Sequence, residues 1–133
     1  MSKDKYLIGR KESIKRVFTQ EDVNNFANLT GDDNPIHTDI EFASNSIFGK
    51  PVVHGVLASA LFSTLLGTVF TKYGGIYLSQ NSNFVKPIFI GEEITAEIEL
   101  TDIKMKDIGF FTTKCFNKKG EVVIRGDAKC KLP

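Results

Sequence analysis

The sequence predicts an α+β protein in which an antiparallel β-sheet wraps around one long buried helix. The stretch from about His54 to Lys72 is apolar on nearly every side, and a helix without a polar face must be surrounded by other structure. From Ile76 to the C-terminus the residues read as strands, in which apolar and polar positions often alternate. Packing the apolar face of such a sheet on the helix is the economical way to bury both.

Length and composition place residues 1–133 in one globular domain. A chain of 133 residues is large enough for a single hydrophobic core but not for two. Its 41% hydrophobic and 25% charged residues are ordinary for a soluble protein. A net charge of +1 gives no electrostatic reason to expect a nucleic acid or an acidic membrane as a partner. A mild basic cluster is interpreted as a solvated face, with a phosphate or carrier-protein patch as the alternative. It comprises Lys3, Lys5, Arg10, Lys11, Lys15 and Arg16.

Three features favour a cytoplasmic protein. Cys115 and Cys130 lack metal-ligand spacing and lie beside apolar residues in strand-like segments, so both are expected to be reduced and buried. The N-terminal segment lacks the apolar run of a signal peptide. The most hydrophobic stretch, 52–70, contains a histidine and interspersed serine, threonine and glycine residues. A buried helix is therefore expected there rather than a membrane span.

The N-terminal third predicts a strand, a helix and a bend, in that order. Residues 13–18 form a strand-like run. Thr19 is a suitable N-cap for a helix with acidic residues in its first turn, and Gly31 is a suitable stop. The segment 31–38 is expected to be non-helical because it contains a proline, which lacks a backbone donor. Residues 39–44 are then expected to form a short helical turn.

The C-terminal half is expected to consist of strands at 76–85, 94–101, 108–116 and 122–132. In the second of these, apolar residues alternate with polar ones, which gives one buried and one solvated face. Asn117–Gly120 is a plausible hairpin connection. A sheet of this kind has open edges, and pairing with a second copy is a common way to close them, so a homodimer is expected.

The residues capable of chemistry gather in the loop Leu29–His37, which reads Leu-Thr-Gly-Asp-Asp-Asn-Pro-Ile-His. Asp32 and His37 lie five positions apart, and a proline-bent backbone can turn both side chains toward one point. A carboxylate and an imidazole around one water molecule form an acid–base pair that works near neutral pH. The alternative is a capping aspartate and a histidine bonded to the backbone. Metal binding through Asp32, Asp33 and His37 is conceivable, but nothing else in the sequence supports it.

Two further positions have both a chemical and a structural interpretation. Asn34 can hold a water molecule or a carbonyl group, but Asn-Pro is also a common turn in which the amide bonds its own backbone. Gly55 starts the long helix, where unpaired backbone N–H groups can stabilise a developing enolate oxygen. It can equally serve only to relieve crowding. His54 is interpreted as a packing or capping residue rather than a catalyst.

The loop 29–37, followed by Ala43, resembles the hydratase 2 motif of the MaoC-like hydratases. The resemblance is closest to the short bacterial (R)-specific enoyl-CoA hydratases that feed polyhydroxyalkanoate synthesis. It extends through 48–55, 61–63, 76–78 and 84–87 with Gly91, and so covers most of the chain. The resemblance implies a hot-dog fold, in which an inserted overhanging segment carries the catalytic loop.

The same resemblance implies roles for individual residues. Asp32 and His37 would form the catalytic pair, and Asn34 would position water or substrate. The Gly55 amide would be the oxyanion donor. Ser63 and Leu66 would line the acyl pocket. No cofactor and no metal are implied.

The implied reaction is the reversible syn addition of water to a trans-2-enoyl-CoA, giving an (R)-3-hydroxyacyl-CoA. An acyl carrier protein in place of CoA, which would make the protein a 3-hydroxyacyl-ACP dehydratase, is the first alternative. An acyl-CoA thioesterase is the second, although thioesterases of this fold commonly carry a carboxylate on the central helix, whereas 55–72 contains no Asp or Glu. A non-catalytic acyl-binding module is the third.

Overall fold

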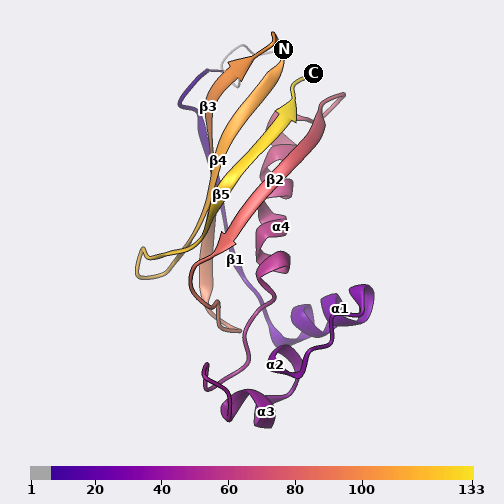
Figure 1. Ribbon diagram of the computed structural model, residues 1–133, viewed down its shortest axis with the longest axis vertical. Helices are drawn as coiled ribbons and strands as arrows, with labels where there is room; N and C mark the ends of the chain where they lie inside the picture. Colours follow the sequence, from indigo (N-terminus) through magenta and orange to yellow (C-terminus); the bar gives the residue numbers. More distant parts are fainter. Residues whose placement is uncertain (1–6) are drawn as a thin grey trace.

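The computed structural model describes residues 7–133 (Figure 1). Strand β1 (Lys11–Val17) is followed by three short helices, α1 (Gln20–Thr30), α2 (Pro35–Thr38) and α3 (Ile40–Ser44). Helix α4 (Gly55–Leu65) continues into one π-helical turn, η2 (Leu66–Phe70). Strands β2 (Ile76–Phe84), β3 (Glu93–Lys104), β4 (Ile108–Asn117) and β5 (Val122–Lys131) complete the chain. Lys3 and Lys5 of the basic cluster, with the start of the N-terminal segment, lie outside the described residues.

The five strands form one antiparallel sheet in the order β1-β3-β4-β5-β2. Helix α4 lies along one face of this sheet, and α1, α2 and α3 hang below its lower end (Figure 1). The core lies between helix and sheet, where Phe62, Leu66 and Phe70 meet Ile98 and Phe111. Together α4 and η2 make a central helix of 16 residues. This is the expected hot-dog fold, with the loop 31–34 carried on the overhanging segment.

Local signals explain where several elements begin and end. The Thr19 side chain accepts a hydrogen bond from the Asp22 N–H (3.1 Å), and the Asp22 carboxylate accepts one from the Thr19 N–H (2.9 Å). This reciprocal capping box starts α1. Gly31, with φ 81°, ends α1 in the left-handed conformation that favours glycine.

The predicted alternation in β3 is also confirmed, since its apolar positions are fully buried; they are Ile94, Ala96, Ile98 and Leu100.

One part of the predicted bend is helical. The prediction of non-helical chain over 31–38 is correct as far as Asn34, but Pro35–Thr38 forms a single helical turn. The Asn34 side-chain oxygen accepts the Ile36 N–H at 3.1 Å, which caps this turn. Proline is compatible with the first helical position because the N–H of that residue needs no intrahelical acceptor.

The sequence predicted a helix surrounded by other structure, but α4 is covered on only one side within a single chain. Its residues Ala58 and Phe62 are buried against the sheet, but Val56 is 60% exposed and Ser63 and Thr64 are exposed as well. The reason is that a single sheet covers only one side of a helix. The helix also ends at Phe70 rather than Lys72.

Edge strand β2 also leaves apolar side chains in solvent. Ile76 is 53% and Leu78 is 51% exposed, and the outer edge of β2 pairs with no other strand of the described sheet. The predicted open edge is therefore present. A row of unpaired backbone groups beside apolar side chains is a ready site for association.

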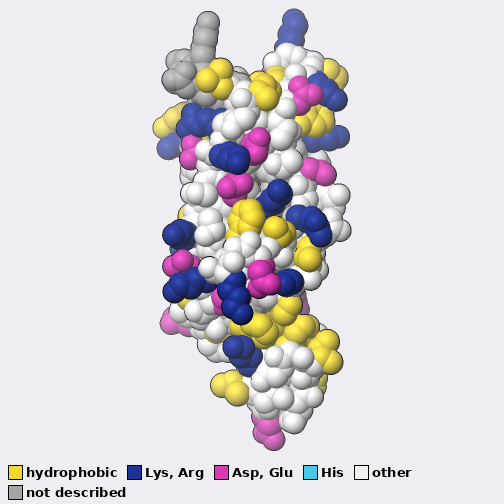
Figure 2. All heavy atoms as spheres, turned by 90° about the vertical axis from the view of Figure 1, so that its left-hand side faces the viewer, with side chains coloured by type: hydrophobic (Ala, Val, Ile, Leu, Met, Phe, Trp, Pro, Cys, Tyr) yellow, Lys and Arg dark blue, Asp and Glu magenta, His cyan; other side chains and the backbone are white. Residues whose placement is uncertain are grey.

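The remaining bulk predictions concern the thiols, the membrane and the surface charge. Cys115 and Cys130 are free and buried, as predicted. Burial raises the pKa of the Cys115 thiol to about 12 and that of the Cys130 thiol to about 11. No helix within 7–133 is both long and apolar enough to cross a membrane. On the face shown in Figure 2, Lys and Arg side chains are interspersed with Asp and Glu rather than gathered into one basic surface.

Candidate active site

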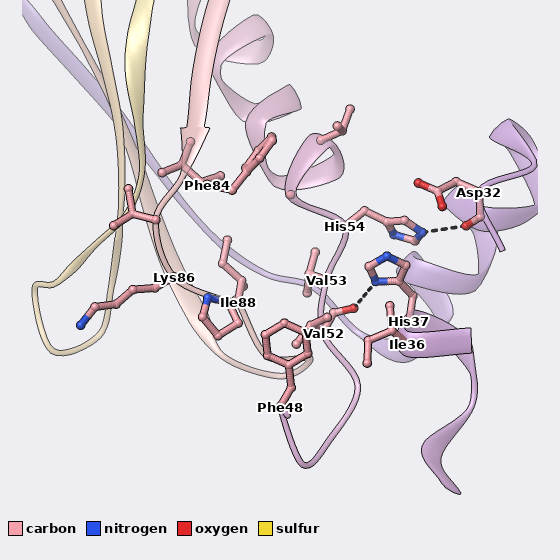
Figure 3. Close-up of a pocket in the computed structure, with 15 residues that line it drawn as sticks. Asp32, Ile36, His37, Phe48, Val52, Val53, His54, Phe84, Lys86 and Ile88 are labelled. Atoms are coloured by element: carbon pink, nitrogen blue, oxygen red, sulfur yellow. Dashed lines mark hydrogen bonds between the residues drawn. The ribbon is translucent and has the colours of Figure 1, made fainter. Parts of the chain in front are cut away.

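His37 projects from the α2 turn and is fixed by the backbone of the segment before α4. Its Nδ1 lies 2.7 Å from the Val52 carbonyl oxygen (Figure 3). A carbonyl oxygen can only accept, so Nδ1 carries the hydrogen and, in the neutral ring, Nε2 keeps the free lone pair. The Val52 N–H donates in turn to the Ile36 carbonyl at 3.3 Å, which ties the two segments together. This arrangement prepares His37 Nε2 to accept a proton.

His54 lies directly against His37. The two rings are stacked, with centroids 3.8 Å apart and planes 26° apart. His54 is buried, and its Nε2 is 2.9 Å from the backbone carbonyl oxygen of Asp32, which makes Nε2 the protonated nitrogen (Figure 3). Phe26 packs on His54 with ring centroids 4.7 Å apart.

Asp32 follows the end of α1, and its carboxylate is exposed. Its N–H donates to the Thr30 hydroxyl at 3.2 Å, and its carbonyl accepts from His54. Polar atoms of Asp32, His37 and His54 all lie within 4.8 Å of one another. The structure therefore brings Asp32 and His37 together, as their spacing in the sequence predicted.

Both residues line a cavity of about 440 Å³ at the start of α4. Gly55 lines the same cavity. Most of the other walls are apolar, and they include Ile36, Phe48, Val53, Phe84 and Ile88 (Figure 3). Lys86 lies at the wall nearest the sheet, and its ammonium forms an ion pair with the Glu121 carboxylate. An apolar cavity with one acid–imidazole pair suits a substrate with a hydrocarbon chain and one reacting polar group.

Gly55 is needed at its position for packing, whatever else it does. A Cβ added there would lie 2.5 Å from Cδ1 of the Phe84 ring, well inside van der Waals contact. Gly55 is also the first residue of α4, so its N–H has no acceptor within the helix. The packing interpretation and the oxyanion-donor interpretation are compatible at this residue.

The other predicted site residues lie apart from this cavity. Asn34 is exposed, and its side-chain oxygen is used in the cap of α2. Ser63 is exposed on the uncovered face of α4, and Leu66 is buried under the sheet. None of the three lines the cavity that contains Asp32 and His37.

Sequence reasoning from the residues alone did not place Phe84 and Lys86 at the site. These residues come from the end of β2 and the loop after it, about 50 positions from the loop 31–34. The resemblance includes the segment 84–87, but it assigned neither residue a place at the site.

Asp32, His37 and His54 make a poor metal site. The Nδ1 of His37 and the Nε2 of His54 each point to a carbonyl oxygen, and the remaining nitrogen of His54 is buried. This leaves His37 Nε2 and the Asp32 carboxylate as accessible ligands. A catalytic zinc site normally has three protein ligands.

A hot-dog fold with a carboxylate–imidazole pair at the start of its central helix defines a class of acid–base enzymes that includes the hydratases. The MaoC-like domain family matches residues 8–123, and the chain belongs to this family. It is similar to the (R)-specific enoyl-CoA hydratase of Aeromonas caviae, with 40% identity over 134 residues that cover 100% of both chains.

One further relative and one solved structure are similar over nearly the whole chain. A mitochondrial 3-hydroxyacyl-[acyl-carrier-protein] dehydratase, FERN, from Solanum lycopersicum is 40% identical over 129 residues, which cover 95% of this chain and 77% of the relative. The solved structure of the (R)-hydratase from A. caviae involved in PHA biosynthesis superimposes with a TM-score of 0.91 at 40% identity. That superposition covers 96% of this chain and 97% of the other.

Proposed function

We propose that this protein is an (R)-specific enoyl-CoA hydratase, which reversibly hydrates trans-2-enoyl-CoA to (R)-3-hydroxyacyl-CoA. The observation that carries the proposal is the meeting of the Asp32 carboxylate and the His37 ring at one apolar cavity. The full-length similarity to the Aeromonas hydratase supports the choice of reaction and of its stereochemistry.

In the proposed mechanism, one water molecule is held between the Asp32 carboxylate and Nε2 of His37. As its oxygen attacks C3 of the enoyl thioester, one of its protons passes to the pair, and a proton returns from the pair to C2 on the same face. The thioester oxygen takes up negative charge in between, and the Gly55 N–H is the proposed donor to it. The product gains one water in total, and no other reagent is consumed.

The environment of His37 supports its role as the base. Because Nδ1–H donates to the Val52 carbonyl, the ring is held in one orientation and the imidazolium formed in the reaction keeps an acceptor. General acid–base groups placed in this way typically contribute about 10²–10⁴-fold to the rate, and one oxyanion donor about 10²–10³-fold.

CoA is the proposed carrier, and an acyl carrier protein is the second candidate. The similarity to a mitochondrial 3-hydroxyacyl-[acyl-carrier-protein] dehydratase is the observation that favours the second. The chemistry at Asp32 and His37 is the same with either carrier. Comparing kcat/KM for crotonyl-CoA and for a crotonyl carrier-protein thioester separates the two candidates.

The central test is a hydratase assay on the wild type and on the Asp32→Asn and Asp33→Asn variants. Loss of the ultraviolet absorbance of crotonyl-CoA measures hydration, and chiral analysis of the product identifies the (R) isomer. Asp32→Asn should lower kcat at least about 100-fold, since it removes the carboxylate without changing its size. Asp33→Asn is the matched control, because Asp33 is an exposed neighbour that does not line the cavity, and it should keep wild-type activity.

Two results would reject the proposal. Release of free thiol from acyl-CoA by the wild type, in place of hydration, would make the protein a thioesterase. Tight binding of acyl-CoA without turnover would make it a binding module.

We also propose that two copies form a homodimer through the uncovered face of α4 and the exposed edge of β2. Val56 and Leu78 are apolar side chains left in solvent there. Light scattering after size exclusion should show twice the mass of the chain. Leu78→Glu should convert the dimer to a monomer. Met105→Glu, which changes another exposed apolar residue, should leave the dimer intact. An unchanged dimer in Leu78→Glu would refute this interface.

The free, buried cysteines support a reducing compartment, and we propose the cytoplasm as the location.

A further inference from the structure

A histidine at position 54 lowers the stability of the fold if its side chain only fills space. It is 2% exposed, and its Nδ1 has no hydrogen-bond partner among residues 7–133. Leaving a buried polar atom unpaired is unfavourable, and a phenylalanine would occupy the same position without that cost. His54 is also the N-cap residue of α4, but its side chain makes no capping hydrogen bond.

What the His54 ring does make is two contacts to the acid–imidazole pair. Its Nε2–H donates to the Asp32 carbonyl oxygen at 2.9 Å, and no other described residue donates to that oxygen. Its face stacks on His37 at 3.8 Å. Asp32 itself lies in an exposed stretch between α1 and α2, where regular structure does not fix the backbone.

We propose that His54 is a positioning residue that holds the Asp32 backbone so that the carboxylate stays beside His37. The hydrogen bond to the Asp32 carbonyl sets the direction in which the carboxylate leaves the chain, whereas the His37 ring is already held by its own hydrogen bond to the Val52 carbonyl. This inference rests on the proposed hydratase function. His54 itself exchanges no proton with the substrate.

Two substitutions separate positioning from packing. In His54→Gln the amide nitrogen reaches about as far as Nε2 and can still donate to Asp32, but the ring that packs between Phe26 and His37 is lost. In His54→Phe the ring and its packing remain, but the donor is lost. The two variants therefore exchange the two properties of the native side chain.

Hydration of crotonyl-CoA and thermal unfolding are measured for the wild type and both variants. His54→Phe should lower kcat about 10–100-fold with KM changed less than about twofold, because misplaced reacting groups lower the chemical step. Its melting temperature should equal or exceed that of the wild type. His54→Gln should keep kcat within about threefold of the wild type while melting at a lower temperature.

Amide hydrogen exchange provides a readout that does not depend on catalysis. Exchange in the segment 31–36 should be faster in His54→Phe than in the wild type, and close to the wild type in His54→Gln. Activity that falls in parallel with melting temperature, or wild-type kcat in His54→Phe, would overturn the positioning role. An inactive wild type would instead overturn the proposed function, so the two failures are distinct.

Discussion

Replacing Gly55 by alanine tests whether the glycine is required for packing or for catalysis. The new Cβ would lie 2.5 Å from Cδ1 and 2.7 Å from Cε1 of Phe84. Carbon atoms in contact prefer about 3.5–4.0 Å, so the ring must move by roughly 1 Å or more. Overpacking of this size typically costs about 1–3 kcal/mol. For a chain of this length each kcal/mol lowers the melting temperature by roughly 3–5 °C, so a fall of about 3–15 °C is expected.

A double-mutant cycle with Phe84→Leu isolates the clash. Leucine is shorter and flexible, so Gly55→Ala in the Phe84→Leu background should cost much less than in the wild type, with a coupling of about 1–3 kcal/mol. Melting temperature and crotonyl-CoA hydration are measured for all four proteins. If the glycine serves packing alone, relief of the clash also restores kcat.

If a substrate oxygen must approach the Gly55 N–H closely, kcat stays low in the double mutant although its stability returns. Additive stability effects in the cycle would contradict the geometry at this site altogether. The assay thus distinguishes the two interpretations that the sequence left open.

Three further outcomes are expected. Burial raises the pKa of the Cys115 thiol from 9.0 to about 12 and that of the Cys130 thiol from 9.0 to about 11. Because the folded protein favours the protonated thiols, they contribute stability that is fully present below pH 9. This stability is lost as the pH rises through 11–12. The melting temperature should fall over that range, and native thiols should resist a disulfide reagent at pH 8 until the protein unfolds; rapid native reaction would contradict their burial. Gln80→Leu should destabilise by about 1–3 kcal/mol in urea titrations, because the buried Thr113 hydroxyl loses the amide donor 3.0 Å away. Thr113→Val should cost less, since the partly exposed Gln80 amide can bond water, and the reverse order would refute this account. Hydration activity should be unchanged after dialysis against EDTA; loss that added zinc or magnesium restores would show a metal that the two accessible ligands do not predict.

The parts of this fold that were predictable are those encoded over a few residues. The capping box joins Thr19 to Asp22, and the alternation in β3 repeats every two residues. The approach of Asp32 to His37 was predictable for the same reason, because the two are only five positions apart. The cap at Asn34 was one of two interpretations considered, although it also turns the following residues into a helix.

Contacts between distant segments were not predictable from the sequence pattern. The stacking of His37 on His54 spans 17 positions, and the approach of Phe84 to Gly55 joins a strand end to a helix start. Neither leaves a periodic signal. The roles predicted for Ser63 and Leu66 stay predictions.

The apolar residues on α4 show a different limit. A hydrophobic pattern states which residues avoid water, but not whether their own chain or another copy covers them. Val56 was therefore expected in the core of one chain, yet it is exposed in the single chain.

The anchor of His37 is a main-chain oxygen, and this has a consequence for genetics. No amino-acid exchange at Val52 deletes a carbonyl, so systematic mutagenesis would record position 52 as sensitive to shape and indifferent to hydrogen-bonding capacity. The contact that selects the imidazole tautomer is therefore invisible to any survey of side chains. Weakening it requires chemical synthesis, for example a thioamide at that peptide link.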